Sequence, residues 1–221
     1  MELRTGTGGQ GLVEVIVNIF QISLLVIAFF VAVRNALDTH KREWSVAALF
    51  YAVYFMADIY WVLIVYFYHR NPDFYISEIG WYSAFLFIDI LIIMIRPKEE
   101  QAVRSRLLWI VPAFTFLMFV FFVVYGGDIP GNIVTFLLMT FILYRSARGL
   151  LYLKDAGPEE NSRRRMLYTI IMISGLCEYG MWTISCFWMG DTFRNPYFWI
   201  DMTMSVLMVL LIPAIGKAVR E

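Results

Sequence analysis

Seven stretches of about 20 mostly apolar residues fill most of this chain, and each is long enough to cross a bilayer as a helix. The stretches are residues 11–34, 44–68, 74–95, 107–125, 130–153, 166–189 and 197–217. Of the 221 residues, 60% are hydrophobic, and the mean hydropathy is +0.66. A water-soluble domain of this length would expose too much apolar surface. We therefore expect an all-α, polytopic membrane protein, with residues 1–221 forming one domain of seven transmembrane helices.

Basic residues alternate between the connections that join these stretches. Most lie around the connections that follow the first, third and fifth stretches or at the end of the chain: Arg34, Lys41, Arg42, Arg96, Lys98, Arg104, Arg106, Arg145, Arg148, Lys154, Arg163, Arg164, Arg165, Lys217 and Arg220. The other side has only Arg4, Arg70 and Arg194. The positive-inside rule then predicts an N-terminus outside, a C-terminus in the cytoplasm and a location in the cytoplasmic or plasma membrane. Basic and acidic residues number 18 each, so net charge indicates no nucleic-acid partner.

A shared tripeptide indicates an internal repeat. Arg-Asn-Pro occurs at residues 70–72 and 194–196, before the third and the seventh stretch. Superposing the two copies lays residues 11–95 onto 130–217 and leaves 107–125 as a linker helix, which is the order of a parallel three-plus-one-plus-three repeat. A chance match of three residues is the alternative. Since Thr115 is the only polar side chain inside the linker, we expect this helix to face lipid outside the other six.

Six acidic residues lie in or at the ends of five stretches: Glu14, Asp58, Glu78, Asp89, Glu178 and Asp201. An ionisable group inside a membrane is costly unless it faces protein, water or a partner, which makes it a candidate functional residue. At about 1.5 Å per helical residue, Asp58 and Glu178 fall near the middle of the membrane. Asp89 falls toward the inner side, and the other three fall near the outer ends.

Helical spacing gives the two central acids aromatic neighbours on the same helix face. The predicted binding set is Tyr51, Tyr54, Asp58, Trp61, Glu178 and Trp182. Carboxylates beside aromatic rings favour a cation, and organic amines in particular. We expect these residues to line a central cavity, with Asp89, Glu78, Asp201 and Glu14 as proton-relay or vestibule residues.

Structural interpretations of the same acids remain open. Glu14, Glu78 and Asp201 lie where a negative charge is favourable at the start of a helix. Asp58 and Glu178 can instead be protonated groups that hydrogen-bond neighbouring helices. For Asp89, a structural bond and a role in proton transfer are equally consistent with the sequence.

The favoured hypothesis is a transporter or facilitator of a small polar, cationic solute, in which Asp58 and Glu178 bind the solute or exchange a proton. A seven-helix sensor that signals through a separate partner is the alternative. An intramembrane hydrolase with paired carboxylates is a weaker one, because the only histidines, His40 and His69, lie at opposite membrane faces and exclude a histidine-based zinc site. We expect no metal or cofactor; the expected partners are the bilayer, a small-molecule ligand, and a second copy of the chain or a signalling protein.

Overall fold

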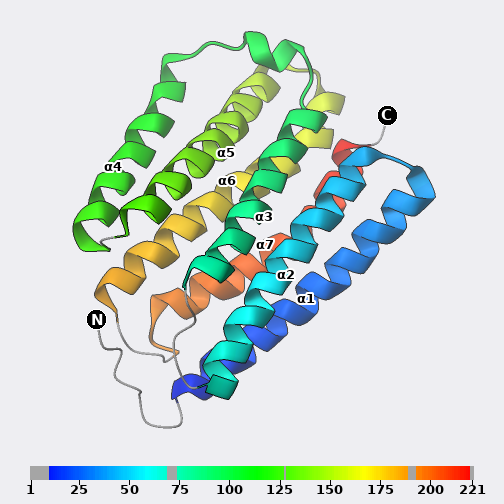
Figure 1. The fold of residues 1–221 in the computed structure, drawn as a ribbon. Helices are drawn as coiled ribbons and strands as arrows, with labels where there is room; N and C mark the ends of the chain where they lie inside the picture. Colours follow the sequence, from blue (N-terminus) through cyan, green and yellow to red (C-terminus); the bar gives the residue numbers. More distant parts are fainter. Residues whose placement is uncertain (1–9, 69–73, 127, 189–192, 220–221) are drawn as a thin grey trace.

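The computed structural model describes residues 10–68, 74–126, 128–188 and 193–219. Its elements are α1 (Gln10–Thr39), α2 (Arg42–Tyr68), α3 (Phe74–Ile95), the 3-10 helices η1 (Glu99–Ala102) and η2 (Arg106–Trp109), α4 (Ile110–Tyr125), α5 (Ile129–Asp155), α6 (Pro158–Phe187) and α7 (Pro196–Ala218) (Figure 1). Among the described residues, seven helices are long and apolar enough to cross a membrane. The predicted all-α, seven-helix class is confirmed at that level.

Local chemistry explains where two of the helices begin. The side chain of Asp128 accepts a hydrogen bond from the Gly131 amide at the start of α5, and Asn195 caps α7 through the Tyr197 amide. Both are N-cap residues of the preferred type, and each helix has a proline in its first turn, where a missing N–H costs nothing.

The first turns of α6 are polar, and the helix starts at Pro158 rather than near residue 166. Glu159 pairs with Arg163, and Glu160 pairs with Arg164, one helical turn further on. Such pairs stabilise helix that is too polar for a hydropathy window to detect. The sequence therefore placed the apolar part of α6 correctly and missed its polar extension.

Six of the helices form a closed ring. Neighbours in the ring are α1, α2, α3, α5, α6 and α7 in that order, and α7 contacts α1 to complete it. The remaining helix, α4, packs mainly on α5 at one side of the bundle, as Figure 1 shows. Only 17% of its apolar window is buried, the lowest share of the seven. The α4 helix therefore lies outside the ring of the other six.

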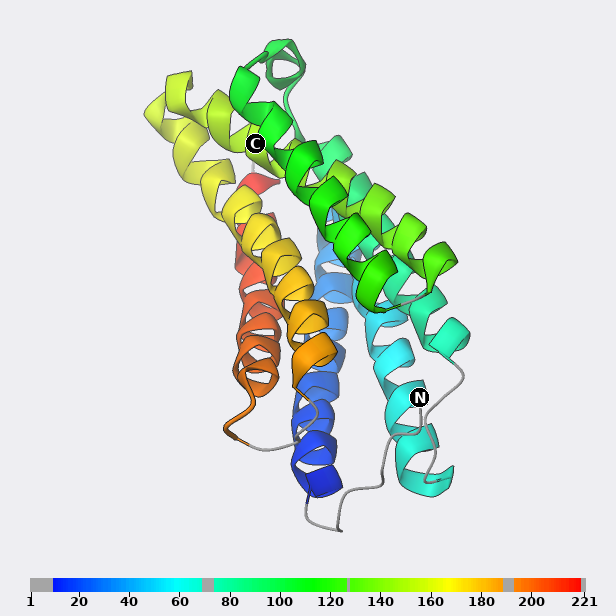
Figure 2. The ribbon, with the colours of Figure 1, turned by 90° about the vertical axis from the view of Figure 1, so that its left-hand side faces the viewer.

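Alternating helix direction brings three connections to one end of the bundle. The α1–α2, α3–α4 and α5–α6 connections and the end of α7 lie there together with η1 (Figures 1 and 2), and we call this the η1 end. The α1–α2 connection is tight, because His40 adopts a left-handed conformation with φ of 54°. Beside it, the Lys41 ammonium donates a 2.7 Å hydrogen bond to the Val219 carbonyl after α7.

Candidate functional site

Three carboxylates from different helices are near enough inside the ring to interact electrostatically, although they are not packed tightly enough to hold a metal ion. Asp58 of α2 interacts electrostatically with Glu178 of α6 and with Asp201 of α7, and Glu178 also interacts with Asp201. The buried Tyr54, one turn before Asp58 on α2, interacts with all three. We call Asp58, Glu178 and Asp201 the carboxylate cluster.

Asp58 is the most enclosed member of the cluster, with 7% of its surface exposed. Its Oδ1 accepts a 2.9 Å hydrogen bond from the indole N–H of Trp81 on α3. Its Oδ2 is buried without a hydrogen-bond partner among the described residues. The Trp61 ring lies beside the Trp81 ring, with centroids 5.9 Å apart. Because a buried oxygen without a partner loses its hydration energy, this atom is an available acceptor for a ligand.

Glu178 has a similar arrangement on the other side of the ring. Its Oε1 accepts a 3.0 Å hydrogen bond from the indole N–H of Trp182, four residues later on α6. The Trp182 ring also packs edge-on against Phe122 of α4, with centroids 6.4 Å apart. Each of the two central acids therefore has one indole donor, and the two donors come from different helices.

The remaining predicted binding residue, Tyr51, lies outside this cluster. It is completely buried two turns before Asp58, and its hydroxyl donates a 2.7 Å hydrogen bond to the Met208 carbonyl of α7. Tyr51 thus joins α2 to α7. Tyr51 and Asp58 share one face of α2, but this face is two turns long, so Tyr51 contacts α7 whereas Asp58 contacts α3.

The predicted vestibule acids separate in the structure. Glu78 is buried and hydrogen-bonds Tyr82; it interacts electrostatically with Asp128 at the start of α5 rather than with the cluster. The Tyr82 hydroxyl also donates a 3.2 Å hydrogen bond to the Gly131 carbonyl. These residues join α3 to α5 at the end of the bundle opposite η1. Glu14 lies in α1, but its side chain is outside the described residues.

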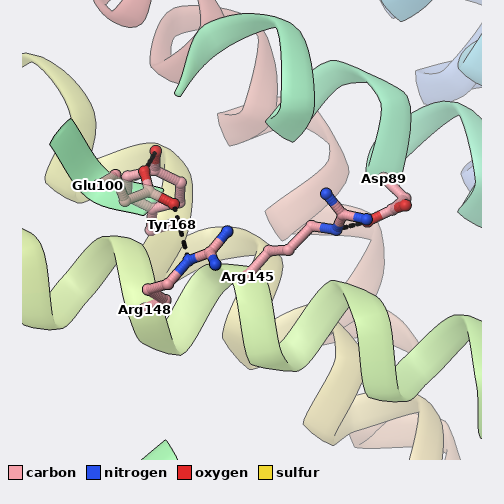
Figure 3. Close-up of polar contacts among 5 residues, drawn as sticks. All are labelled: Asp89, Glu100, Arg145, Arg148 and Tyr168. Carbon is pink, nitrogen blue, oxygen red and sulfur yellow. Dashed lines mark hydrogen bonds and ion pairs between the residues drawn. The ribbon is translucent and has the colours of Figure 1, made fainter. Parts of the chain in front are cut away.

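Asp89 is paired with an arginine that the sequence assigned only to membrane orientation. Its Oδ1 lies 2.9 Å from the Nε of Arg145 on α5, as Figure 3 shows. The exposed fractions of the two side chains are 11% for Asp89 and 20% for Arg145, so water screens the pair weakly. No local spacing links positions 89 and 145, and only the packing of α3 on α5 brings them together.

A second acid–arginine contact lies closer to the η1 end and involves a residue that the sequence analysis did not select. The Glu100 side chain of η1 is fully buried, and its Oε1 lies 3.7 Å from the Nε of Arg148. Its Oε2 accepts a 2.5 Å hydrogen bond from the hydroxyl of Tyr168 on α6 (Figure 3). Burial raises the pKa of the Glu100 carboxyl, although the Tyr168 hydrogen bond and the arginines Arg148, Arg96 and Arg164 act in the opposite direction.

A small apolar cavity lies between the carboxylate cluster and these ion pairs. It leaves about 20 Å³ for water-sized molecules. Its lining includes Phe50, Phe85, Ile88, Met139, Ile142, Met208 and Ser174. The Ser174 hydroxyl is buried and has no hydrogen-bond partner among the described residues. Within the same residues, no three histidine, cysteine or acidic side chains are grouped so that they could hold a metal ion.

Comparisons with models of known families, with curated proteins and with solved structures find no match to this chain.

Proposed function

We propose that this protein is a multi-pass membrane transporter or facilitator for a small organic cation, which binds at the carboxylate cluster. The observation that carries the proposal is the contrast between the two sets of acids. Asp89 and Glu100 each face an arginine, whereas Asp58 and Glu178 interact with other acids and with indole N–H groups. Acids grouped in a low-dielectric interior attract a cation strongly.

The aromatic side chains favour an organic ammonium over a small, strongly hydrated ion. The Trp81 and Trp182 indoles donate to the carboxylates, and Trp61 lies against Trp81. Indole and phenol rings attract cations through their electron-rich faces, and they replace water around a methylated or alkylated nitrogen more readily than around a bare metal ion. An ammonium can also donate to the free Oδ2 of Asp58.

The ring supports the repeat and the orientation as parts of this proposal. With α1–α3 and α5–α7 as equivalent units, the α3–α5 contact corresponds to the α7–α1 contact, and both are present. The α4 helix outside the ring then acts as the linker. Since the η1 end has Lys41, Arg96, Arg148 and Lys217 near it, the positive-inside rule makes it the cytoplasmic end.

Binding and flux of defined amines test the proposal. Methylamine, tetramethylammonium and 1,4-diaminobutane are compared by thermal shift in detergent, and any stabilising amine is then followed as a radiolabel into proteoliposomes. We expect saturable binding and flux in the wild type and a loss of both in Asp58→Asn and Glu178→Gln. Glu99→Gln, which changes an exposed acid on η1, is the matched control. Normal flux in Asp58→Asn would remove Asp58 from the mechanism.

A seven-helix sensor is the second candidate. It is favoured by the ion pairs that join the α3, α5 and η1 segments at the η1 end, because ligand binding at the cluster would change the contacts of helices that end there. A second copy of the chain or a separate signalling protein would then bind the exposed η1 end and respond to its change in conformation. Saturable amine binding without flux in proteoliposomes distinguishes this function from transport.

A further inference from the structure

Inside the ring, three layers of side chains follow one another along the axis of the bundle toward the η1 end. The carboxylate cluster comes first, the apolar cavity second and the acid–arginine contacts third. On α2, Phe50 of the cavity lies eight residues from Asp58, or about 12 Å along the helix. On α3, the cavity residue Ile88 directly precedes Asp89. A solute that leaves the cluster toward the η1 end must cross both of the other layers.

The middle layer has no stable place for water. A buried water needs two to four polar partners, and among the described residues Ser174 is the one polar side chain that lines the cavity. With about 20 Å³ of space, the layer is too small for an organic cation. It therefore separates the cluster from the η1 end in this conformation.

The third layer joins the two halves of the ring, of which one is α1–α3 with η1 and the other is α5–α7. Arg145 and Arg148 lie three residues apart on one face of α5. Arg145 reaches Asp89 on α3, and Arg148 reaches Glu100 on η1, which directly follows α3 in the chain. Tyr168 of α6 holds the other oxygen of Glu100. Every one of these contacts runs from the α1–α3 half, with η1, to the α5–α7 half.

A further contact between the halves lies at the η1 end. There Lys41, before α2, donates to the Val219 carbonyl after α7. At the opposite end of the α3–α5 contact, Tyr82 donates to Gly131, but the like charges of Glu78 and Asp128 face each other across it. At the η1 end the described contacts between the halves thus include two acid–arginine pairs, whereas two acidic side chains lie near each other at the opposite end.

We propose that the Asp89–Arg145 pair and the Glu100–Arg148–Tyr168 contact form a gate that closes the η1 end of the bundle. Opening it requires the two halves to separate there, which removes Glu100 from its site between α5 and α6 and admits water to the apolar cavity. Motion of one repeat against the other is the usual form of alternating access. The inference rests on the proposed function for its role in transport, but the gate itself is testable without a solute.

The reactivity of a cysteine at position 174 measures the gate directly. Cys177 and Cys186 are replaced by serine, Ser174→Cys is introduced, and inside-out and right-side-out vesicles are treated with a positively charged, membrane-impermeant methanethiosulfonate reagent. A Lys98→Cys variant identifies the preparation that exposes the η1 end, because Lys98 is exposed just before η1. We expect slow modification of position 174 from that side. Glu100→Gln and Asp89→Asn should raise the rate about tenfold, which corresponds to about 1.4 kcal/mol in favour of the open state.

Two further variants separate gate opening from general unfolding. Tyr168→Phe keeps the ring, which packs closely on Gly149, and removes only the hydroxyl, so it should also raise the rate. Glu99→Gln changes the exposed neighbour of Glu100 and should leave the rate unchanged. Equal rates in wild type, Glu100→Gln, Asp89→Asn and Tyr168→Phe would overturn the gate. An increased rate in a protein that carries no amine would support the gate and contradict the proposed transport function.

Discussion

At the scale of single residues, the buried acids differ in what faces them. Asp58 has an indole donor on one oxygen and no hydrogen-bond partner on the other, whereas Glu100 accepts from Tyr168 on one oxygen and has the Arg148 guanidinium 3.7 Å from the other. The first arrangement leaves an acceptor for a ligand, and the second uses the acid to hold three segments together. Glu100 lies outside the membrane-spanning helices, in η1, so its titration can be followed through stability.

Burial raises the pKa of Glu100, so the folded protein binds this proton more tightly than the unfolded chain does. The stabilising effect is full below the ordinary glutamate value of about 4.3 and is lost as pH rises through the raised pKa. Glu100→Gln has no carboxyl to ionise. We therefore expect the melting temperature of the wild type, relative to that of Glu100→Gln, to fall as pH rises from about 4.

Thermal unfolding in detergent across a pH series measures this difference. Glu99→Gln removes the same chemical group from the exposed side of η1 and should follow the wild type. A difference between wild type and Glu100→Gln that stays constant with pH, or increases, would contradict the assignment.

At the scale of the helices, both sets of acids are positioned by close helix contacts, one between α2 and α3 and one between α5 and α6. A Cβ atom added at Gly80 of α3 would lie 2.7 Å from the Cβ of Ala57 on α2. Since Trp81 and Asp58 are the next residues in each helix, this contact sets the distance over which Trp81 donates to Asp58. At Gly149 of α5, an added Cβ would lie 2.5 Å from the Tyr168 ring, which presents the hydroxyl to Glu100.

Gly80→Ala is expected to push α3 away from α2 and to lower the free energy of unfolding by about 1–3 kcal/mol, the usual cost of overpacking. It should also weaken amine binding, because Trp81 moves with α3. Thermal unfolding and amine thermal shifts measure the two effects. Gly157→Ala is the control: nothing lies within 4 Å of the added atom, and because Gly157 is the N-cap of α6, its effect should stay within about 1 kcal/mol. Equal stability of the two variants would show that α2 and α3 adjust without cost.

At the scale of the whole molecule, the ring of six helices creates the interior in which the polar layers lie. The α4 helix contributes to it mainly through α5, where the hydroxyls of Thr115 and Thr140 lie 2.7 Å apart. Thr115 thus attaches α4 to α5 of the ring. The apolar residues around Thr115, such as Phe116 and Leu117, are exposed on the outside of the bundle.

Thiol labelling at the two ends of the bundle tests the orientation. In the Cys177→Ser, Cys186→Ser background, Lys98→Cys should react with an impermeant reagent only in inside-out vesicles, because the positive-inside rule makes the η1 end cytoplasmic. Arg194→Cys, which is exposed at the other end just before α7, should react only in right-side-out vesicles. The reverse pattern would show the opposite orientation, and labelling of both positions from one side would contradict the membrane-spanning arrangement.

The sequence by itself determined the class of the protein and the positions of its apolar helices, because a run of apolar residues of membrane-spanning length leaves the backbone few alternatives to a helix. It also placed Asp58 beside Tyr54 and Glu178 beside Trp182, because helical spacing alone fixes which side chains share a face. These relations are local, so no partner helix was needed to find them.

Only the tertiary structure decided which acids meet. Asp201 joins Asp58 and Glu178, Glu78 faces Asp128 instead, and Arg145 and Arg148, which the charge pattern assigned to orientation, reach the buried acids Asp89 and Glu100. The order of helices in the ring controls these pairings, and that order depends on close contacts such as the one at Gly80. The length of the arginine side chain makes these pairings harder to predict, because an arginine can reach an acid on any helix that packs nearby. Contacts of this kind join positions far apart in the chain and therefore have no local signature.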